Sequence, residues 1–244
     1  MKKEKIKKLS RDVIQFEINA LKSLKKNIND SFIKVIKTIL ECKNGKVIIS
    51  GVGKSGIISR KWAATLSSTG TPSFFLDPTN ASHGDLGQIT SNDIVILISN
   101  SGESNELKNI IQYTSRNSSI KLIGITSKKD SILFKNSDVS FLMPSIKEAG
   151  LENIVPTSST TSQLALGDAI AIACMKYKNF NKFDFKKIHP AGNLGAQLKT
   201  VEDIMLTGEK IPFIDQTVKM NKALKILSNK KLGILIIRNK KKIT

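Results

Sequence analysis

Hydrophobic and polar positions follow two different periods along the chain. Near the N-terminus, apolar residues recur at helical spacing in Leu9–Leu24 and Ser31–Cys42, which predicts two amphipathic helices, the second stopping at Asn44-Gly45. Farther on, short runs rich in Val, Ile, Leu and Phe predict buried strands. The first run begins at Val47, and the others are Ser73–Leu76, Ile94–Ser99, Lys121–Thr126 and Val139–Met143.

Helical patterns lie between most of these strands, at Ile57–Ser68, Ser104–Tyr113 and Ser131–Lys135. Apolar strands that alternate with helices are typical of a parallel sheet covered on both faces. The sequence therefore predicts an α/β fold. In such folds, ligands bind at the carboxyl ends of the strands, so the loops that follow the strands are the places to search for a site.

The turn after the first strand has the composition of an anion site. It reads Gly-Val-Gly-Lys-Ser-Gly from Gly51 to Gly56 and precedes a predicted helix. Glycines let the backbone approach an oxyanion, and the unpaired N–H groups of a first helical turn point at it. Lys54 adds a positive charge and Ser55 adds a hydroxyl. The turn therefore predicts a bound phosphate.

The turn from Gly51 to Gly56 partly matches two nucleotide-binding motifs. The glycine spacing that begins at Gly51 fits the dinucleotide fingerprint, and Asp77 follows about 20 residues on, where a ribose-binding acid would sit. Gly-Lys-Ser also imitates a P-loop, but that pattern needs a glycine where Ile48 stands. The P-loop interpretation fails on this spacing, and serine-rich turns farther along the chain argue against the dinucleotide.

Two more turns are rich in hydroxyl side chains. The loop after the third strand carries Ser99, Ser101 and Ser104 and leads into a helix, where one serine would suffice for capping. A third turn, Pro156–Thr161, opens a predicted helix through Leu164–Met175. These turns are expected to meet at one edge of the sheet. The residues predicted to bind phosphate are Ser55, Ser99, Ser101, Ser104, Thr157, Ser158, Ser159 and Thr160.

Candidate proton carriers fall in the same loops. His83 and His189 are the only histidines in the chain, and both lie in segments rich in Gly or Pro instead of on apolar faces. Glu106 lies near the start of the helix after the serine loop, and Glu148 follows the last strand. For each glutamate taken alone, a solvated surface carboxylate is the simpler interpretation.

Composition narrows the class of protein. The chain has 244 residues, enough for one full domain and a smaller appendage, with 40% hydrophobic residues. Its net charge of +19 comes almost entirely from lysine, and aromatics make up only 5%, so no nucleic-acid partner is predicted. No apolar stretch approaches the ~18 residues of a membrane span, and no membrane association is expected. Cys42 and Cys174 are expected to be reduced, and the protein is predicted to be cytoplasmic.

Six segments in order carry a resemblance to a known family. They read Gly-Val-Gly-Lys-Ser-Gly, Ser-Thr-Gly-Thr-Pro-Ser-Phe-Phe, His-Gly-Asp-Leu-Gly, Ser-Asn-Ser-Gly-Glu-Ser, Pro-Thr-Ser-Ser-Thr-Thr and His-Pro-Ala-Gly. Over about residues 10–244, the chain resembles the D-arabinose 5-phosphate isomerases, which are sugar isomerase (SIS) domain enzymes. The resemblance implies a three-layer αβα domain with a five-stranded parallel sheet. It also implies conversion of D-ribulose 5-phosphate to D-arabinose 5-phosphate for the Kdo branch of lipopolysaccharide synthesis.

The resemblance also implies roles for individual residues. It marks a catalytic set made of Lys54, His83, Glu106, Glu148 and His189. Glu148 is expected to be the base at C1 and C2, and His83 to open the sugar ring and move hydroxyl protons, with Glu106 and His189 assisting. Moving a proton through an enediol requires no metal or cofactor, and none is expected. A homo-oligomer, dimer or tetramer, is expected.

The chain departs from the family pattern in two places. Gly150-Leu151-Glu152 stands where relatives carry a cysteine and a proline, which affects the loop near Glu148. Residues 1–200 are expected to form the SIS domain, and residues 201–244 resemble only part of a first CBS domain. Two alternatives stay open: a sugar-phosphate sensor without enzymatic activity, and an isomerase of another phosphosugar such as a hexulose 6-phosphate.

Overall fold

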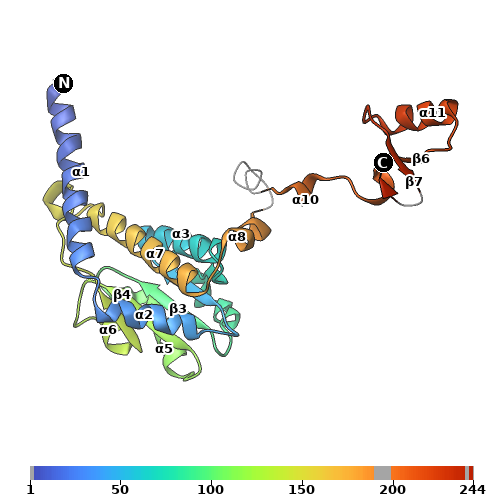
Figure 1. Cartoon of the computed structure of the whole chain (residues 1–244). Coiled ribbons are helices and arrows are strands. Elements are labelled where there is room, and N and C mark those ends of the chain that lie inside the picture. Colours follow the sequence, from blue (N-terminus) through green and yellow to red (C-terminus); the bar gives the residue numbers. More distant parts are fainter. Residues whose placement is uncertain (1–2, 190–198, 240–241, 244) are drawn as a thin grey trace. The chain divides into compact units, whose positions relative to one another are not determined.

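The structure, a computed structural model, describes residues 3–189, 199–239 and 242–243 (Figure 1). The chain forms two compact units, Met1–His189 and Pro190–Thr244. The first unit contains a five-stranded sheet in the order β2-β1-β3-β4-β5, and every neighbouring pair is parallel. Its strands are β1 (Val47–Gly51), β2 (Ser73–Phe75), β3 (Ile94–Ile98), β4 (Lys121–Thr126) and β5 (Val139–Leu142).

Side-chain alternation along the strands builds a core on each face of this sheet. Val47 and Ile49 of β1 face one hydrophobic cluster, whereas Ile48 faces the other. The first cluster is covered by α1 (Lys3–Lys26), α2 (Asp30–Glu41), α3 (Gly53–Ser68) and α7 (Ser158–Tyr177). The second is covered by α4 (Pro78–Ala81), α5 (Lys108–Ser115) and α6 (Ile132–Asn136). The predicted α/β fold with three layers is confirmed.

Most predicted elements occur, with shifted ends. The helix predicted from Ile57 begins earlier, at Gly53, so Lys54 and Ser55 lie in its first turn. Close packing accounts for two of the glycines in this turn, because a Cβ on Gly56 would lie 2.6 Å from the carbonyl oxygen of Gly51, and a Cβ on Gly51 would lie 2.8 Å from Ser59 Oγ. The helix predicted at Ser104–Tyr113 begins as a 3-10 turn, η2 (Asn105–Leu107), and continues as α5. Elements of this unit that the pattern did not predict are α4, α8 (Lys182–Ile188) and the 3-10 turns η1 (Asp85–Gln88) and η3 (Leu151–Asn153).

The second unit has a small sheet of its own, in the order β6-β7-β8. Strands β6 and β7 are parallel with helix α11 between them in the chain, and β8 is antiparallel to β7. The elements are α10 (Val201–Ile204), η4 (Gly208–Lys210), β6 (Phe213–Asp215), α11 (Met220–Lys230), β7 (Ile236–Asn239) and β8 (Lys242–Ile243). The CBS assignment and the boundary at residue 200 stay predictions.

Two further sequence expectations concern cysteines and membranes. Cys42 and Cys174 are both free thiols, as predicted, and burial raises the pKa of Cys174 to about 11. Within the described ranges, no helix is long and apolar enough to cross a membrane. The Pro-Ala-Gly segment that follows His189 falls on residues 190–198, which lie outside the described part of the chain.

Candidate functional site

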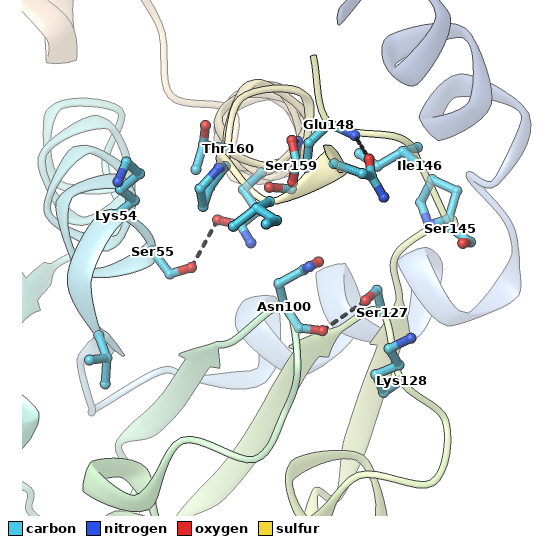
Figure 2. Close-up of a pocket in the computed structure, with 16 residues that line it drawn as sticks. Lys54, Ser55, Asn100, Ser127, Lys128, Ser145, Ile146, Glu148, Ser159 and Thr160 are labelled. Carbon is cyan, nitrogen blue, oxygen red and sulfur yellow. Dashed lines mark hydrogen bonds between the residues drawn. The ribbon is translucent and has the colours of Figure 1, made fainter. Parts of the chain in front are cut away.

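A pocket of about 440 Å³ lies at the carboxyl ends of the strands, where the α/β pattern predicts a ligand (Figure 2). The loops after β3, β4 and β5 meet the first turns of α3 and α7 there. The lining residues are Val52, Lys54, Ser55, Asn100, Ser127, Lys128, Pro144, Ser145, Ile146, Glu148, Asn153, Ile154, Pro156, Ser159, Thr160 and Gln163. Five residues predicted for the site are therefore brought together: Lys54, Ser55, Glu148, Ser159 and Thr160.

Helix α3 contributes a charge and a hydroxyl to the pocket. Lys54 and Ser55 lie in its first turn, where backbone N–H groups have no partner within the helix. Among the described residues, no carboxylate pairs with the ammonium of Lys54. The Ser55 hydroxyl donates to Gln163 Oε1 at 3.2 Å. This side of the pocket is suited to an anion that approaches the N-terminus of α3.

Glu148 is held against the first turn of α7. Its Oε2 accepts hydrogen bonds from the backbone N of Thr157 at 2.8 Å and of Ser159 at 3.1 Å, and from Thr157 Oγ1 at 3.2 Å. The carboxylate thus caps this helix, since Thr157 makes no side-chain cap of its own. Burial raises the pKa of Glu148, but hydrogen bonds from Ser159 and Thr157 outweigh burial and hold the pKa below its usual value. Glu148 is therefore ionised at neutral pH while it lines the pocket.

Six polar residues in the pocket wall were not predicted: Asn100, Ser127, Lys128, Ser145, Asn153 and Gln163. Asn100 follows β3, and its backbone oxygen accepts from Ser127 Oγ at 2.7 Å, which joins the loops after β3 and β4. Lys128 lies next in the chain, across the pocket from Lys54 in Figure 2. Gln163 lies on α7 and is only 2% exposed. The sequence signal that could have identified Gln163 is its place as a long polar residue at the start of the apolar helical run Leu164–Met175.

The serine loop after β3 is stabilised by its own hydroxyls. Ser99 Oγ lies 3.0 Å from Ser104 Oγ and accepts from the backbone N of Gly102 at 3.0 Å. Ser101 Oγ accepts from the backbone N of Glu103 at 3.3 Å. Ser99, Ser101 and Ser104 lie outside the pocket lining as the described residues define it, so their phosphate-binding role stays a prediction.

Two predicted phosphate ligands at the start of α7, Thr157 before its first residue and Ser158 within it, do not line the pocket. Thr157 binds Glu148, and Ser158 is fully buried with a hydroxyl that has no partner among the described residues. Neither is part of the lining of the pocket. Ser159 and Thr160, one and two residues farther on, are.

His83, Glu106 and His189 also lie outside the pocket lining. His83 is exposed between α4 and η1, and Glu106 is exposed in η2, an element that packs against α4. His189 caps the end of α8, where its Nδ1 lies 2.9 Å from the oxygen of Phe185 and its ring stacks on that phenylalanine at 3.7 Å. Of the predicted catalytic set, Lys54 and Glu148 therefore line the pocket. The other three residues lie elsewhere on the unit.

Asp77, which the rejected dinucleotide motif would place at a ribose, has a structural role. Asp77 caps α4 by accepting from the backbone N of Thr79 at 2.9 Å, and it lies 3.7 Å from Arg60. The Asp77 carboxylate thus stabilises the start of α4. Throughout the described ranges, no group of three or more His, Cys, Asp or Glu side chains could hold a metal ion.

Comparisons with known proteins agree on one family. A model described as SIS domain matches residues 39–173. The arabinose 5-phosphate isomerase KdsD of Francisella tularensis is 45% identical over 229 residues, which is 93% of this chain and 70% of the relative. KdsD of Escherichia coli K12 is 43% identical over 228 residues, 93% and 69% of the two chains. Among solved structures, E. coli CFT073 c3406 in complex with arabinose 5-phosphate has a TM-score of 0.75 and 39% identity, over 78% of this chain and 100% of that one.

Proposed function

The chain belongs to the SIS domain family and, within it, to the arabinose 5-phosphate isomerases, and from this premise we propose that it interconverts D-ribulose 5-phosphate and D-arabinose 5-phosphate. The reaction moves a proton between C1 and C2 through an enediol. Its product feeds the Kdo branch of lipopolysaccharide synthesis. The observation that carries the proposal is the pocket that an ionised Glu148 shares with Lys54 and Ser55.

Glu148 is the base of this proposal. Removing a proton from a carbon next to a carbonyl requires a positioned group in its basic form, and hydrogen bonds from α7 keep this carboxylate both ionised and oriented. An ionised carboxylate can take the proton from one carbon and return it to the next. Lys54 has no carboxylate partner among the described residues, so its ammonium is available to stabilise the enediolate oxygen.

The phosphate is assigned to the side of the pocket formed by Ser55, Ser159 and Thr160. Hydroxyls and unpaired backbone N–H groups at the start of α3 support this assignment. A clamped phosphate fixes the reacting carbons at a set distance, which is the main contribution that binding makes to such a reaction. Ser99, Ser101 and Ser104 are proposed to assist from the neighbouring loop.

His83, Glu106 and His189 are proposed to act from a second copy of the chain. All three lie outside the pocket lining, and His83 and Glu106 are exposed. Large apolar side chains on α1, such as Leu9 at 57% and Ile14 at 57% exposure, support a homo-oligomer, dimer or tetramer, that covers them. His83 would then open the sugar ring, with the other two residues assisting. The cytoplasmic location stays a prediction.

An assay across phosphosugars tests this function. We expect the purified chain to interconvert D-ribulose 5-phosphate and D-arabinose 5-phosphate. A hexulose 6-phosphate and unphosphorylated D-ribulose should react at least ~100-fold less efficiently in kcat/KM, because the reacting carbons lose their fixed distance from the phosphate. Product is measured by coupled enzymatic detection of each aldose. Failure to interconvert the two pentose phosphates, or a clear preference for the hexulose phosphate, would contradict the proposal.

A further inference from the structure

Gln163 is a buried amide in the pocket wall to which the proposed mechanism gives no role. It lies on α7, lines the pocket, and is only 2% exposed. Its backbone is anchored, because the fully buried Trp62 donates its Nε1–H to the Gln163 carbonyl oxygen at 2.8 Å. A polar side chain in such a position costs desolvation free energy unless its amide is hydrogen-bonded. The contacts of this amide therefore show what it can do.

The amide contacts the Ser55 hydroxyl. Ser55 Oγ donates to Gln163 Oε1 at 3.2 Å, and within the described part of the chain Gln163 Nε2 has no acceptor. A serine hydroxyl has a single proton. While the Ser55 hydroxyl donates its proton in a hydrogen bond to Gln163 Oε1, it presents only lone pairs to the pocket. These lone pairs repel a phosphate oxygen.

Turning the amide over reverses this arrangement. The amide oxygen and nitrogen exchange places, so that Nε2 donates to Ser55 Oγ and the Ser55 proton is free to point into the pocket. The amide supplies an acceptor in one orientation and a donor in the other. The hydroxyl of Ser55 can therefore act as the donor to Gln163 in the first orientation and as the acceptor in the second.

We propose that Gln163 is a positioning residue that sets the direction of the Ser55 hydroxyl. When a phosphate enters, Gln163 Nε2 donates to Ser55 Oγ, and Ser55 O–H donates to a phosphate oxygen. This inference deepens the proposed function and rests on it in one respect, that a phosphate binds beside Ser55. Gln163 acts through Ser55 and does not touch the reacting carbons.

A double-mutant cycle tests the coupling. Gln163→Met keeps the side-chain length but removes both donor and acceptor. We expect it to weaken binding of inorganic phosphate and raise KM for D-ribulose 5-phosphate by roughly 2- to 10-fold, the effect of one hydrogen bond, with little change in kcat. In the double variant with Ser55→Ala, binding should be no weaker than in Ser55→Ala alone. Effects that add in full, or a Gln163→Met variant that binds phosphate normally, would overturn the inference.

A second variant and a control keep the result interpretable. Gln163→Glu can only accept the Ser55 proton and adds a negative charge, so it should weaken phosphate binding more than Gln163→Met does; normal binding would overturn the inference. Gln112→Met on α5, where the side chain is exposed, should change neither Tm nor binding. Because phosphate binding needs no turnover, coupling without isomerisation refutes the proposed function alone. Isomerisation without coupling refutes this inference alone.

Discussion

At the scale of single residues, Glu148 combines two properties that a base in this pocket needs. Its carboxylate is exposed enough to line the pocket, yet three hydrogen bonds from Thr157 and Ser159 fix its position. The same bonds hold its pKa below the ordinary value of 4.5. A lower pKa makes the carboxylate a weaker base, so catalysis depends on its placement more than on its basicity.

The lowered pKa predicts how stability depends on pH. Because the pKa in the folded state lies below the value of the unfolded chain, the contact between Glu148 and α7 contributes stability above pH ~4.5 and loses it as the pH falls through the folded pKa. Glu148→Gln should therefore lower Tm between pH ~6 and 8, through the loss of about 0.5–1 kcal/mol of charge–helix stabilisation. The difference should shrink as the pH falls below ~4.5. A difference in Tm that is constant from pH ~3.5 to 8 would contradict this assignment.

Residue-scale prediction from sequence had a clear limit. Lys54 and Ser55 were identified because a glycine turn and a helix start are local signals. Glu148 was identified only through the family resemblance, because a single carboxylate after a strand is more simply interpreted as a solvated surface group. Gln163 was not identified, because it is one polar letter inside a helical segment and its importance comes from Ser55, far away in the chain. The capping of α7 by Glu148 was missed for a similar reason, since the carboxylate reaches that helix only after the loop has folded.

At the scale of elements, the position of the pocket depends on the packing of α3 against α7. Trp62 of α3 is fully buried, and its indole nitrogen donates to the backbone of Gln163 on α7. Gly167 makes room for the ring, because a Cβ there would lie 2.1 Å from Trp62 Nε1. The two helices that supply Ser55 and Ser159 are thereby held in register.

This contact predicts a large cost for Gly167→Ala. The added methyl group would force the Trp62 ring to move and disturb its hydrogen bond, which should lower the free energy of unfolding by about 1–3 kcal/mol. Chemical denaturation at neutral pH measures the change. Gly87→Ala is the matched control, since nothing lies within 4 Å of a Cβ at Gly87. Equal stabilities of the two variants would show that the α3–α7 contact tolerates extra volume.

Elements were predictable where the apolar pattern was strong. The central strands β1 and β3 are continuous runs in which every residue is buried. Short elements such as α4, which spans only Pro78–Ala81, were not predicted. Asp77, which caps α4, instead fits the acid position of a dinucleotide motif in the sequence. Helix ends also shifted, because glycines usually mark turns but here allow α3 to pack closely on β1.

At the scale of the whole molecule, the two compact units differ in what they contribute to the account. Met1–His189 contains the sheet, both cores and the pocket. Pro190–Thr244 has its own small sheet, and its CBS assignment stays a prediction. The net charge of +19 fits a protein that attracts phosphorylated substrates. Fold class was predictable from the alternation of elements, whereas the subunit contacts that would bring His83 and Glu106 to a site are not encoded in any local pattern.

The turnover of Glu148→Gln tests the central claim most directly. The amide keeps the shape and can still accept from α7, but it cannot take up a proton, so kcat for D-ribulose 5-phosphate should fall about 100- to 10,000-fold while binding of inorganic phosphate stays within about 2-fold. Glu152→Gln, in the same loop and exposed, is the control and should leave kcat unchanged. Near-normal turnover by Glu148→Gln would contradict the account, because the base would then be another group.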